Sequence, residues 1–326
     1  MIDNISRYVY EVYRSRSVSE AAKKLFISQP ALSASIKKAE AELGAPIFNR
    51  RTLPFTLTAE GRLYIDAVEQ MLRIEEDTRN GIRDMGDLKS GTLTIATSTH
   101  ISFYAIPRIC EAFSKKFPGI DISIVFDSTA DLPALLERGT ADLIFTPSDS
   151  GLGGFVTEAL LEERCVIAVR RDYRDAERLA PYALDYGEII SRSYGDDRTV
   201  TDLSIFGGLE FIYSPPNTNL YKKKKMFFGE SGMSRHVITS TSNHQLNYNL
   251  MRSGFGALFT TDAAIAASAP SADCLYFALR GEDTTQSFLV AYSQDADSHS
   301  RRIAGEFIRV AKSLFDGEDP LAVFKC

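Results

Sequence analysis

Two groups of side chains in this sequence have types and spacing that suit chemistry, and both favour binding over catalysis. One group is small, polar and basic and lies between residues 28 and 51. The other consists of hydroxyl, amide and imidazole side chains that follow apolar runs near residues 98, 127 and 217. The sequence contains no G-x-S-x-G elbow, no Walker loop and no H-E-x-x-H pair, which are local patterns of catalytic sites. An enzyme whose Ser/His/Asp set is assembled by folding stays open as an alternative.

Cysteine and histidine spacing predicts neither a metal site nor a cofactor. His236 and His244 are eight residues apart and have no third ligand at metal spacing. The cysteines are far apart and form no C-x-x-C, which is typical of reduced thiols in a cytoplasm. They are Cys110, Cys165, Cys274 and Cys326. Because no signal peptide and no apolar run of about 20 residues occurs, we expect a cytoplasmic protein without membrane contact.

The first group must be positioned by two short helices around a tight turn, in the stretch SVSEAAKKLFISQPALSASI at residues 17–36. Ser28 is a suitable N-cap, Pro30 suits the first helical turn, and Gly44 is placed to end the helix. Leu32, Ile36, Ala39 and Leu43 recur at helical spacing and are expected to face inward.

The opposite face of this helix has the chemistry of a DNA reader. A helix that enters a major groove needs short side chains near its start, hydrogen-bonding readers, and lysines for phosphates. Two short extended runs follow and predict a β-wing with a basic tip. The candidate DNA-binding residues are Ser28, Gln29, Pro30, Ser33, Ala34, Ser35, Lys37 and Lys38 on the helix, with Arg50 and Arg51 on the wing. A three-helix packing unit with a solvated polar face is the alternative.

Charge is distributed unevenly along the chain. The net charge is −6, which by itself argues against a nucleic-acid partner. Residues 1–62 nevertheless contain ten basic and six acidic side chains, so this segment carries +4 and the remainder −10. A basic N-terminal module on an acidic body is the asymmetry expected of a DNA-binding protein.

The stretch EAAKKLFISQPALSASIKKAEAELGAPIFNRR, followed by FTLTAEG, resembles the winged helix-turn-helix of LysR-type transcriptional regulators. The sequence departs from that pattern at two places: Ala34-Ser35 stand where the family often has a basic-polar pair, and Ala39 stands where it often has a leucine. The first departure predicts a different operator preference. The matching residues are Ala21-Ala22, Leu25, Ser28-Gln29-Pro30-Ala31, Leu32-Ser33, Ile36, Glu40, Glu42-Leu43-Gly44, Phe48, Arg50, Leu57-Thr58 and Gly61.

A long helix is expected to follow, with Thr58 as its cap. Its apolar positions step by three and four, which resembles a coiled-coil seam interrupted by Glu75 and Thr78. The positions of this seam are Tyr64, Val68, Met71, Thr78, Ile82 and Met85, with Ala67 and Ile74 alongside. Such a helix packs either on its own body or on a second subunit, and the family resemblance implies the second. Residues 86–91, GDLKSG, predict a hinge.

From residue 92 the sequence alternates strand and helix patterns, which predicts an α/β body with a mostly parallel sheet. The resemblance implies two Rossmann-like lobes similar to periplasmic binding proteins. The fold class is thus α/β multidomain, with an N-terminal winged helix-turn-helix, a linker helix and a two-lobed effector domain. The expected boundaries are 1–58 for the DNA-binding domain, 59–90 for linker and hinge, and 91–316 for the effector domain, with lobe one at 91–164 and 269–316 and lobe two at 165–268.

The second group of polar side chains predicts a ligand site between the lobes. Ligands of open α/β sheets bind beyond the carboxyl ends of strands, where helix N-termini offer free amides. The hydroxyls and free amides suit an anionic small molecule, whereas Asp127 disfavours a purely anionic ligand and makes a zwitterion the other expectation. The alternative is that these side chains only cap helices. The candidate effector-binding residues are Ser98, Thr99, His100, Ser102, Asp127, Ser128, Thr129, Asn217, Thr218 and Asn219.

Three interpretations remain, and each assigns the chain to a different functional class of protein. The first is a regulator that binds a partly palindromic site in double-stranded DNA as a dimer, or as a tetramer through the body, and responds to a small molecule. The second is a solute-binding module with an N-terminal interaction unit. The third is the α/β enzyme. The basic module and linker favour the first. The lysine run at 222–225 predicts a solvated helix face, with a polyanion site as its alternative.

Overall fold

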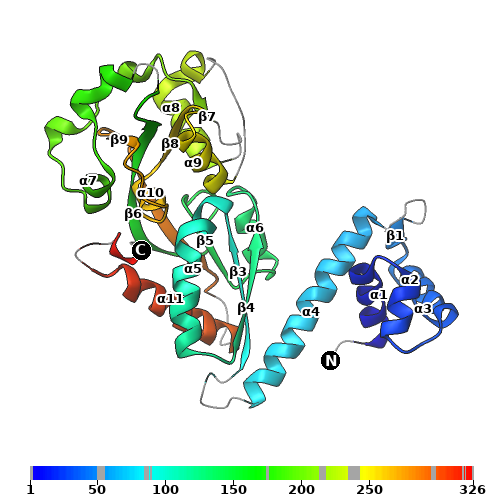
Figure 1. Cartoon of the computed structure of the whole chain (residues 1–326). Helices are drawn as coiled ribbons and strands as arrows, with labels where there is room; N and C mark the ends of the chain where they lie inside the picture. The colour runs from blue at the N-terminus through cyan, green and yellow to red at the C-terminus, as the bar shows by residue number, and fades with distance from the viewer. Residues whose placement is uncertain are drawn as a thin grey trace. The chain divides into compact units, whose positions relative to one another are not determined.

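The computed structural model describes residues 3–49, 56–83, 88, 90–173, 176–212, 218–233, 243–294, 299–317, 319 and 321–324. The chain divides into two compact units, an N-terminal unit that extends to Asp87 and a larger unit that begins at Leu88. Figure 1 traces both units along the chain.

The N-terminal unit is a three-helix domain with a two-stranded wing. The third helix begins where the sequence predicts, because Ser28 accepts a hydrogen bond from the Ala31 amide, and Ser17 caps the second helix in the same way by accepting the Glu20 amide. Gly44 ends the third helix in the left-handed conformation at φ 75°, which glycine adopts without steric cost. The elements are α1 (Asn4–Ser15), α2 (Val18–Lys24), α3 (Gln29–Leu43) and the antiparallel pair β1 (Phe48–Asn49) and β2 (Thr56–Leu57).

The linker is helix α4 (Ala59–Arg83), whose 25 residues span about 38 Å. Its predicted cap is confirmed, since the Thr58 hydroxyl accepts a hydrogen bond of 2.8 Å from the Gly61 amide. The apolar positions divide between two faces. Val68 is fully buried in the N-terminal core, whereas Met71 and Ile74 are exposed. In the predicted hinge at 86–91, residues 86, 87 and 89 lie outside the described residues.

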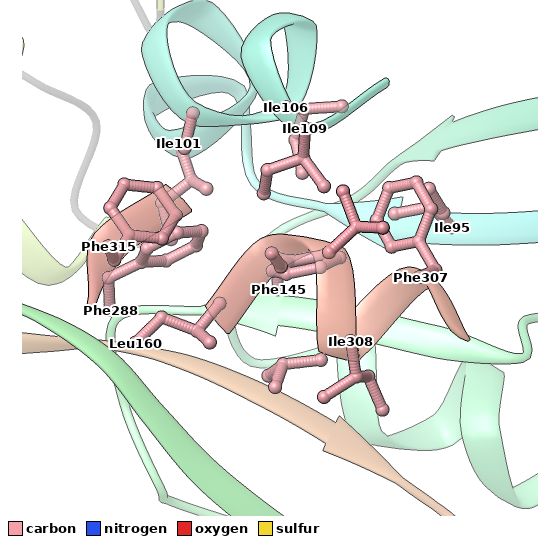
Figure 2. Packing of buried hydrophobic residues seen from close by; sticks show 14 of the residues in the cluster. Ile95, Ile101, Ile106, Ile109, Phe145, Leu160, Phe288, Phe307, Ile308 and Phe315 are labelled. Atoms are coloured by element: carbon pink, nitrogen blue, oxygen red, sulfur yellow. The ribbon is translucent and has the colours of Figure 1, made fainter. Parts of the chain in front are cut away.

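Lobe one of the larger unit is a parallel sheet covered by helices. Isoleucines of α5, among them Ile101 and Ile109, point toward the aromatic rings of Phe145, Phe288 and Phe315 (Figure 2). These rings and isoleucines form the largest apolar cluster of the lobe, and they anchor the start of α5. The elements are β3 (Gly91–Thr97), α5 (Thr99–Lys116), β4 (Ile120–Phe126), α6 (Leu132–Glu137), β5 (Leu143–Thr146) and α11 (His299–Phe315).

Lobe two contains shorter strands and helices. Strand β7 runs parallel to β8, and β9 pairs with the C-terminal end of β6 (Val156–Arg170). The sequence pattern in RHVITST predicts a strand at 235–241, and that whole segment lies outside the described residues. The elements are α7 (Tyr186–Ser191), β7 (Phe211–Ile212), α8 (Asn219–Met233), α9 (His244–Arg252), β8 (Ala257–Thr261), α10 (Asp262–Ala266) and β9 (Cys274–Ala278), with 3₁₀ turns at Ala176–Tyr182, Asp196–Arg198, Leu203–Phe206 and, after α11, Ala322–Phe324.

Two crossing strands join the lobes, and they correct the prediction of a mostly parallel sheet. Strands β6 (Val156–Arg170) and β10 (Thr285–Tyr292) run antiparallel to each other and to their other described neighbours. The strand order is β4-β3-β5-β10-β6-β8-β7, with β9 on β6. The chain leaves lobe one on β6 and returns on β10, so the two strands must oppose each other. The sequence predicts that the chain returns to lobe one near residue 269. In the structure it returns on β10, after β9.

Candidate functional site

The exposed face of α3 is built by the cap at its start and by an acidic side chain near its end. Leu32, Ile36 and Ala39 are buried in the N-terminal core, which turns the polar face outward. Near the C-terminal end, the Glu40 carboxylate accepts the amides of Ile47 at 3.0 Å and Phe48 at 3.4 Å. This carboxylate therefore ties the helix to the first strand of the wing.

Most of the predicted DNA-binding residues lie on this face. The side chains of Ser33 and Ser35 are half-buried, and the Ser35 hydroxyl donates to the Ala31 carbonyl at 3.1 Å. Leu43, expected inward, is 42% exposed because it ends the helix beyond the core. Arg50 and Arg51 lie outside the described residues. The exposed residues of the set are Ser28, Gln29, Pro30, Ala34, Lys37 and Lys38.

An aromatic side chain that the sequence analysis did not select stands beside this face. Phe26, in the turn between α2 and α3, is 95% exposed and has φ 55°. A positive φ is uncommon for a bulky residue and marks a tight turn. No residue pattern in the run LFI marks this aromatic side chain as exposed, so only the turn geometry identifies it as a surface group.

A cavity of about 220 Å³ lies between the two lobes and is lined by side chains of both. Eight of the ten predicted effector residues line it: Ser98, Thr99, His100, Asp127, Ser128, Thr129, Thr218 and Asn219. Ser102 does not, because it lies one turn into α5, where its hydroxyl donates to the Thr99 carbonyl at 2.8 Å. Asn217 lies outside the described residues. The lining that the sequence analysis missed is Phe126, Pro147, Leu220, His244, Asn247 and Gln286.

The polar side chains of the cavity differ in how they are already engaged. Thr218 caps α8 by accepting the Tyr221 amide, and Ser128 bonds the Asp131 carboxylate at 2.5 Å. Ser98 is the N-cap residue of α5, yet its side chain makes no capping bond. Its hydroxyl oxygen is buried and has no hydrogen-bond partner among the described residues. Together with the first amides of α5, which a helix leaves unpaired, this hydroxyl suits a bound anionic group.

Two histidines form one wall of the cavity. The rings of His100 and His244 meet edge to face with centroids 4.9 Å apart, and Tyr104 and Phe103 flank them. Burial lowers the pKa of His244 to about 4. Burial and the neighbouring His244 hold the pKa of His100 well below its ordinary value. Both imidazoles are therefore neutral near pH 7.

A buried carboxyl group lies behind the cavity wall. Glu163 on β6 is 1% exposed, and it accepts hydrogen bonds from the Tyr104 hydroxyl and, at 2.5 Å, from the Gln286 amide. Gln286 in turn accepts the Asn219 amide at 2.8 Å. Burial raises the pKa of Glu163 to about 7. No local pattern identified this group, because its partners come from α5 and β10.

The lysine run does not form one solvated face. Lys222 and Lys225 are exposed, but Lys224 is buried and its ammonium lies 4.1 Å from the centre of the Phe211 ring. Lys223 donates to the Asp283 carbonyl at 2.7 Å. Burial lowers the pKa of Lys224 to about 7. Half of the run therefore belongs to the structure of lobe two.

No group of three or more His, Cys, Asp or Glu side chains has the arrangement of a metal site in the described part of the chain. Among the same residues, no helix has both the length and the apolar character needed to span a membrane.

Comparison with known proteins identifies the family. The model of the LysR substrate binding domain matches residues 86–314, and that of the bacterial regulatory helix-turn-helix protein, lysR family, matches residues 5–62. The chain belongs to the LysR family of transcriptional regulators. It therefore has the family's N-terminal helix-turn-helix and C-terminal effector-binding domain.

Individual relatives agree with this assignment. A probable RuBisCO transcriptional regulator of Emiliania huxleyi is 34% identical over 263 residues, which cover 80% of this chain and 78% of the relative. The HTH-type regulator YcgK of Bacillus subtilis strain 168 is 26% identical over 77% of each chain. The crystal structure of full-length CbnR complexed with its target DNA is similar in fold, with a TM-score of 0.65 at 17% identity over 96% of this chain and 99% of that one.

Proposed function

We propose that the exposed face of α3 contacts the operator and that the 220 Å³ cavity binds the effector of this LysR-family regulator. The observation that carries the proposal is the buried Ser98 hydroxyl at the start of α5, which has no partner among the described residues. A buried polar group without a hydrogen bond is costly. A ligand that bonds this hydroxyl removes the cost, so the site favours occupancy.

The operator contacts follow from the chemistry of the exposed side chains. Gln29 and Ser33 are the candidate readers of base edges, and Lys37 and Lys38 are the candidate phosphate contacts. Arg50 and Arg51 complete the proposed set at the wing. The site is expected to be partly palindromic, because paired readers on a twofold dimer span two half-sites.

The proposed dimer uses the exposed apolar face of α4. Leu63 is 73% exposed, Met71 44% and Ile74 65%, and their spacing of eight and three residues places them on one side of the helix. A second copy of this helix would cover them. Association of the effector domains would then make the tetramer.

The proposed effector is small, polar and anionic or zwitterionic. The cavity is smaller than the roughly 300–1,000 Å³ of sites for drug-sized ligands. The ligand would touch side chains of both lobes, so it would favour one angle between them. An effector changes DNA binding only through such a difference in affinity for two states.

Fluorescence anisotropy on full-length protein tests the proposal. The DNA panel consists of the region upstream of the protein's own gene, RuBisCO promoter DNA, chosen because of the name of the Emiliania huxleyi relative, and an unrelated duplex, each over a salt series. Preference for one duplex with a steep fall in affinity as salt rises is the expected result. Absence of binding at low salt would contradict the proposed operator contacts.

A double variant tests the cavity. Thr99→Val with Thr218→Val should abolish the response of the DNA complex to small carboxylates and amino acids while leaving DNA affinity unchanged. Thr157→Val, an exposed position on β6, is the matched control and should keep the response. Equal loss of DNA binding in the double variant would show that the cavity residues act on folding rather than on the effector.

A further inference from the structure

The hydrogen-bond chain behind the cavity has a definite direction. It begins at the Tyr104 hydroxyl and at Gln286, which both donate to the Glu163 carboxylate. A carboxylate only accepts hydrogen bonds. The amide nitrogen of Gln286 must therefore face Glu163, and its carbonyl oxygen must face the other way.

The orientation of Gln286 decides that of Asn219. The Gln286 oxygen accepts the Asn219 amide nitrogen at 2.8 Å, and the Pro147 carbonyl lies 3.5 Å from the same nitrogen. Both amide hydrogens of Asn219 are thus directed to protein acceptors. What Asn219 has left for a ligand is its carbonyl oxygen, which is an acceptor.

We propose that the Glu163–Gln286 pair orients Asn219 so that the cavity selects ligands with a hydrogen-bond donor, an ammonium or hydroxyl group, beside their anionic group. The proposal rests on the function of the cavity proposed above and names its ligand class. Glu163 and Gln286 are positioning residues, because they act through Asn219. The preferred ligands are α-amino acids, and the disfavoured ones are 2-oxo acids of the same skeleton, which offer only acceptors at that position.

The rest of the cavity agrees with this class. The Asp127 carboxylate lines the same space and attracts a cationic group, while it repels a second anion. The Ser98 hydroxyl, which has no partner within the described part of the chain, and the first amides of α5 supply donors for a carboxylate. A small zwitterion fits this arrangement. Its cationic group would meet the acceptors on Asn219 and Asp127, and its carboxylate would meet the donors at Ser98.

The orientation of this hydrogen-bond chain depends on the protonation state of Glu163. Tyr104, Gln286, Asp262 and Arg192 surround this carboxyl group from α5, β10, α10 and the segment after α7. Burial raises the pKa of Glu163 to about 7, so the carboxylate form that orients Gln286 is populated at pH 8.5. A protonated carboxyl can donate instead, which would release this constraint.

The first experiment measures selectivity with matched pairs of probes. Full-length protein at pH 8.5 is titrated by calorimetry with L-alanine and pyruvate, L-valine and 2-oxoisovalerate, and L-glutamate and 2-oxoglutarate. In each pair that binds, the amino acid should bind at least about tenfold tighter, as expected when a buried polar group is left unpaired by the analogue. Equal or tighter binding of the oxo acids would overturn the proposal, as would the failure of all six compounds to bind at 20 mM.

Two variants test whether selectivity depends on the orientation of Asn219 or only on packing near β10. Gln286→Leu frees Asn219 to rotate and should reduce the selectivity to about twofold, with the affinity for the oxo acid rising. Thr285→Val, an exposed neighbour on the same strand, is the control and should keep the full ratio. An unchanged ratio in Gln286→Leu would overturn the role of the chain.

Neutron diffraction from ligand-free crystals of the deuterated protein at pD 8.5 tests the orientation without any ligand. Deuterons should appear on the Asn219 atom that faces Gln286 and Pro147. Deuterons on the atom that faces the cavity would overturn the inference. This outcome is independent of DNA binding, so a failure of the proposed regulatory function leaves the orientation result intact and distinguishable.

Discussion

His100 on α5 and His244 on α9 meet edge to face with ring centroids 4.9 Å apart, and they join lobe one to lobe two at the cavity. His244 is 4% exposed, the ring nitrogens of His100 are buried, and the Nε2 atoms of both histidines have no hydrogen-bond partner among the described residues. Two imidazoles so close together, with buried nitrogens, are stable together only when they are neutral. The contact between the lobes is therefore sensitive to acid.

The first prediction concerns this sensitivity. The pKa of His244 is lowered from 6.5 to about 4 in the folded chain, so between these values the unfolded chain binds a proton that the folded chain does not. Stability is then present above pH 6.5 and lost as the pH falls toward 4. The loss between pH 7 and pH 5 should be about 2 kcal/mol.

The variant His244→Phe keeps an aromatic ring without a titrating group. The free energy of unfolding is measured by urea unfolding, followed by circular dichroism, at pH 7 and pH 5. Its decrease between the two pH values should be smaller in the variant than in the native protein by about 2 kcal/mol. Equal decreases in the two proteins would contradict the assignment of the acid sensitivity to His244.

The second prediction concerns Glu163, whose contribution to stability changes with pH in the opposite direction. Its pKa is raised from 4.5 to about 7, so between these values the folded chain binds the extra proton. Its contribution to stability is present below pH 4.5 and is lost as the pH rises through 7. At pH 8 the buried charge costs about 3 kcal/mol, and Glu163→Gln should recover part of this.

The gain from Glu163→Gln should shrink as the pH falls to 5, where the native side chain is mostly protonated. The adjacent Glu162 is exposed, so Glu162→Gln is the matched control and should leave stability nearly unchanged at both values. A gain that does not depend on pH would indicate a packing effect of the glutamine.

The third prediction separates base readers from phosphate contacts on α3. Gln29→Ala should weaken the free energy of binding to the preferred duplex by about 1–3 kcal/mol. It should also reduce the preference for this duplex over unrelated DNA. Lys37→Gln should weaken binding to all duplexes and reduce the slope of log affinity against log salt by about 1. Anisotropy titrations over salt measure both. Lys115→Gln on α5, also exposed, is the control.

The fourth prediction concerns the exposed apolar face of α4. Met71→Asp together with Ile74→Asp should shift the protein to a smaller species in sedimentation velocity, because charge at a buried apolar contact is costly. Arg62→Asp, at an exposed position of the same helix, is the control and should leave the oligomer intact. An unchanged sedimentation coefficient for the double variant would place the interface elsewhere.

Much of the local structure could be predicted from the sequence. The caps Ser17, Ser28 and Thr58 and the end of α3 at Gly44 depend on side chains within three residues of the bonds they make. The polar loops after β3 and β4 follow from strand patterns that end abruptly. Their meeting at one cavity follows from a general property of parallel strands, whose carboxyl ends lie at one edge.

The buried polar contacts that the sequence did not indicate depend on long-range pairing. Gln286 bonds Glu163 across 123 positions, and the pairing exists because β6 and β10 cross between the lobes side by side. The division of α4 into a buried Val68 and an exposed Met71 likewise depends on which face the N-terminal core covers. Periodicity and capping determine each element, because they act over one or two turns. The tertiary structure alone decides which buried polar groups meet, because that depends on strand order and on the path of the chain between the lobes.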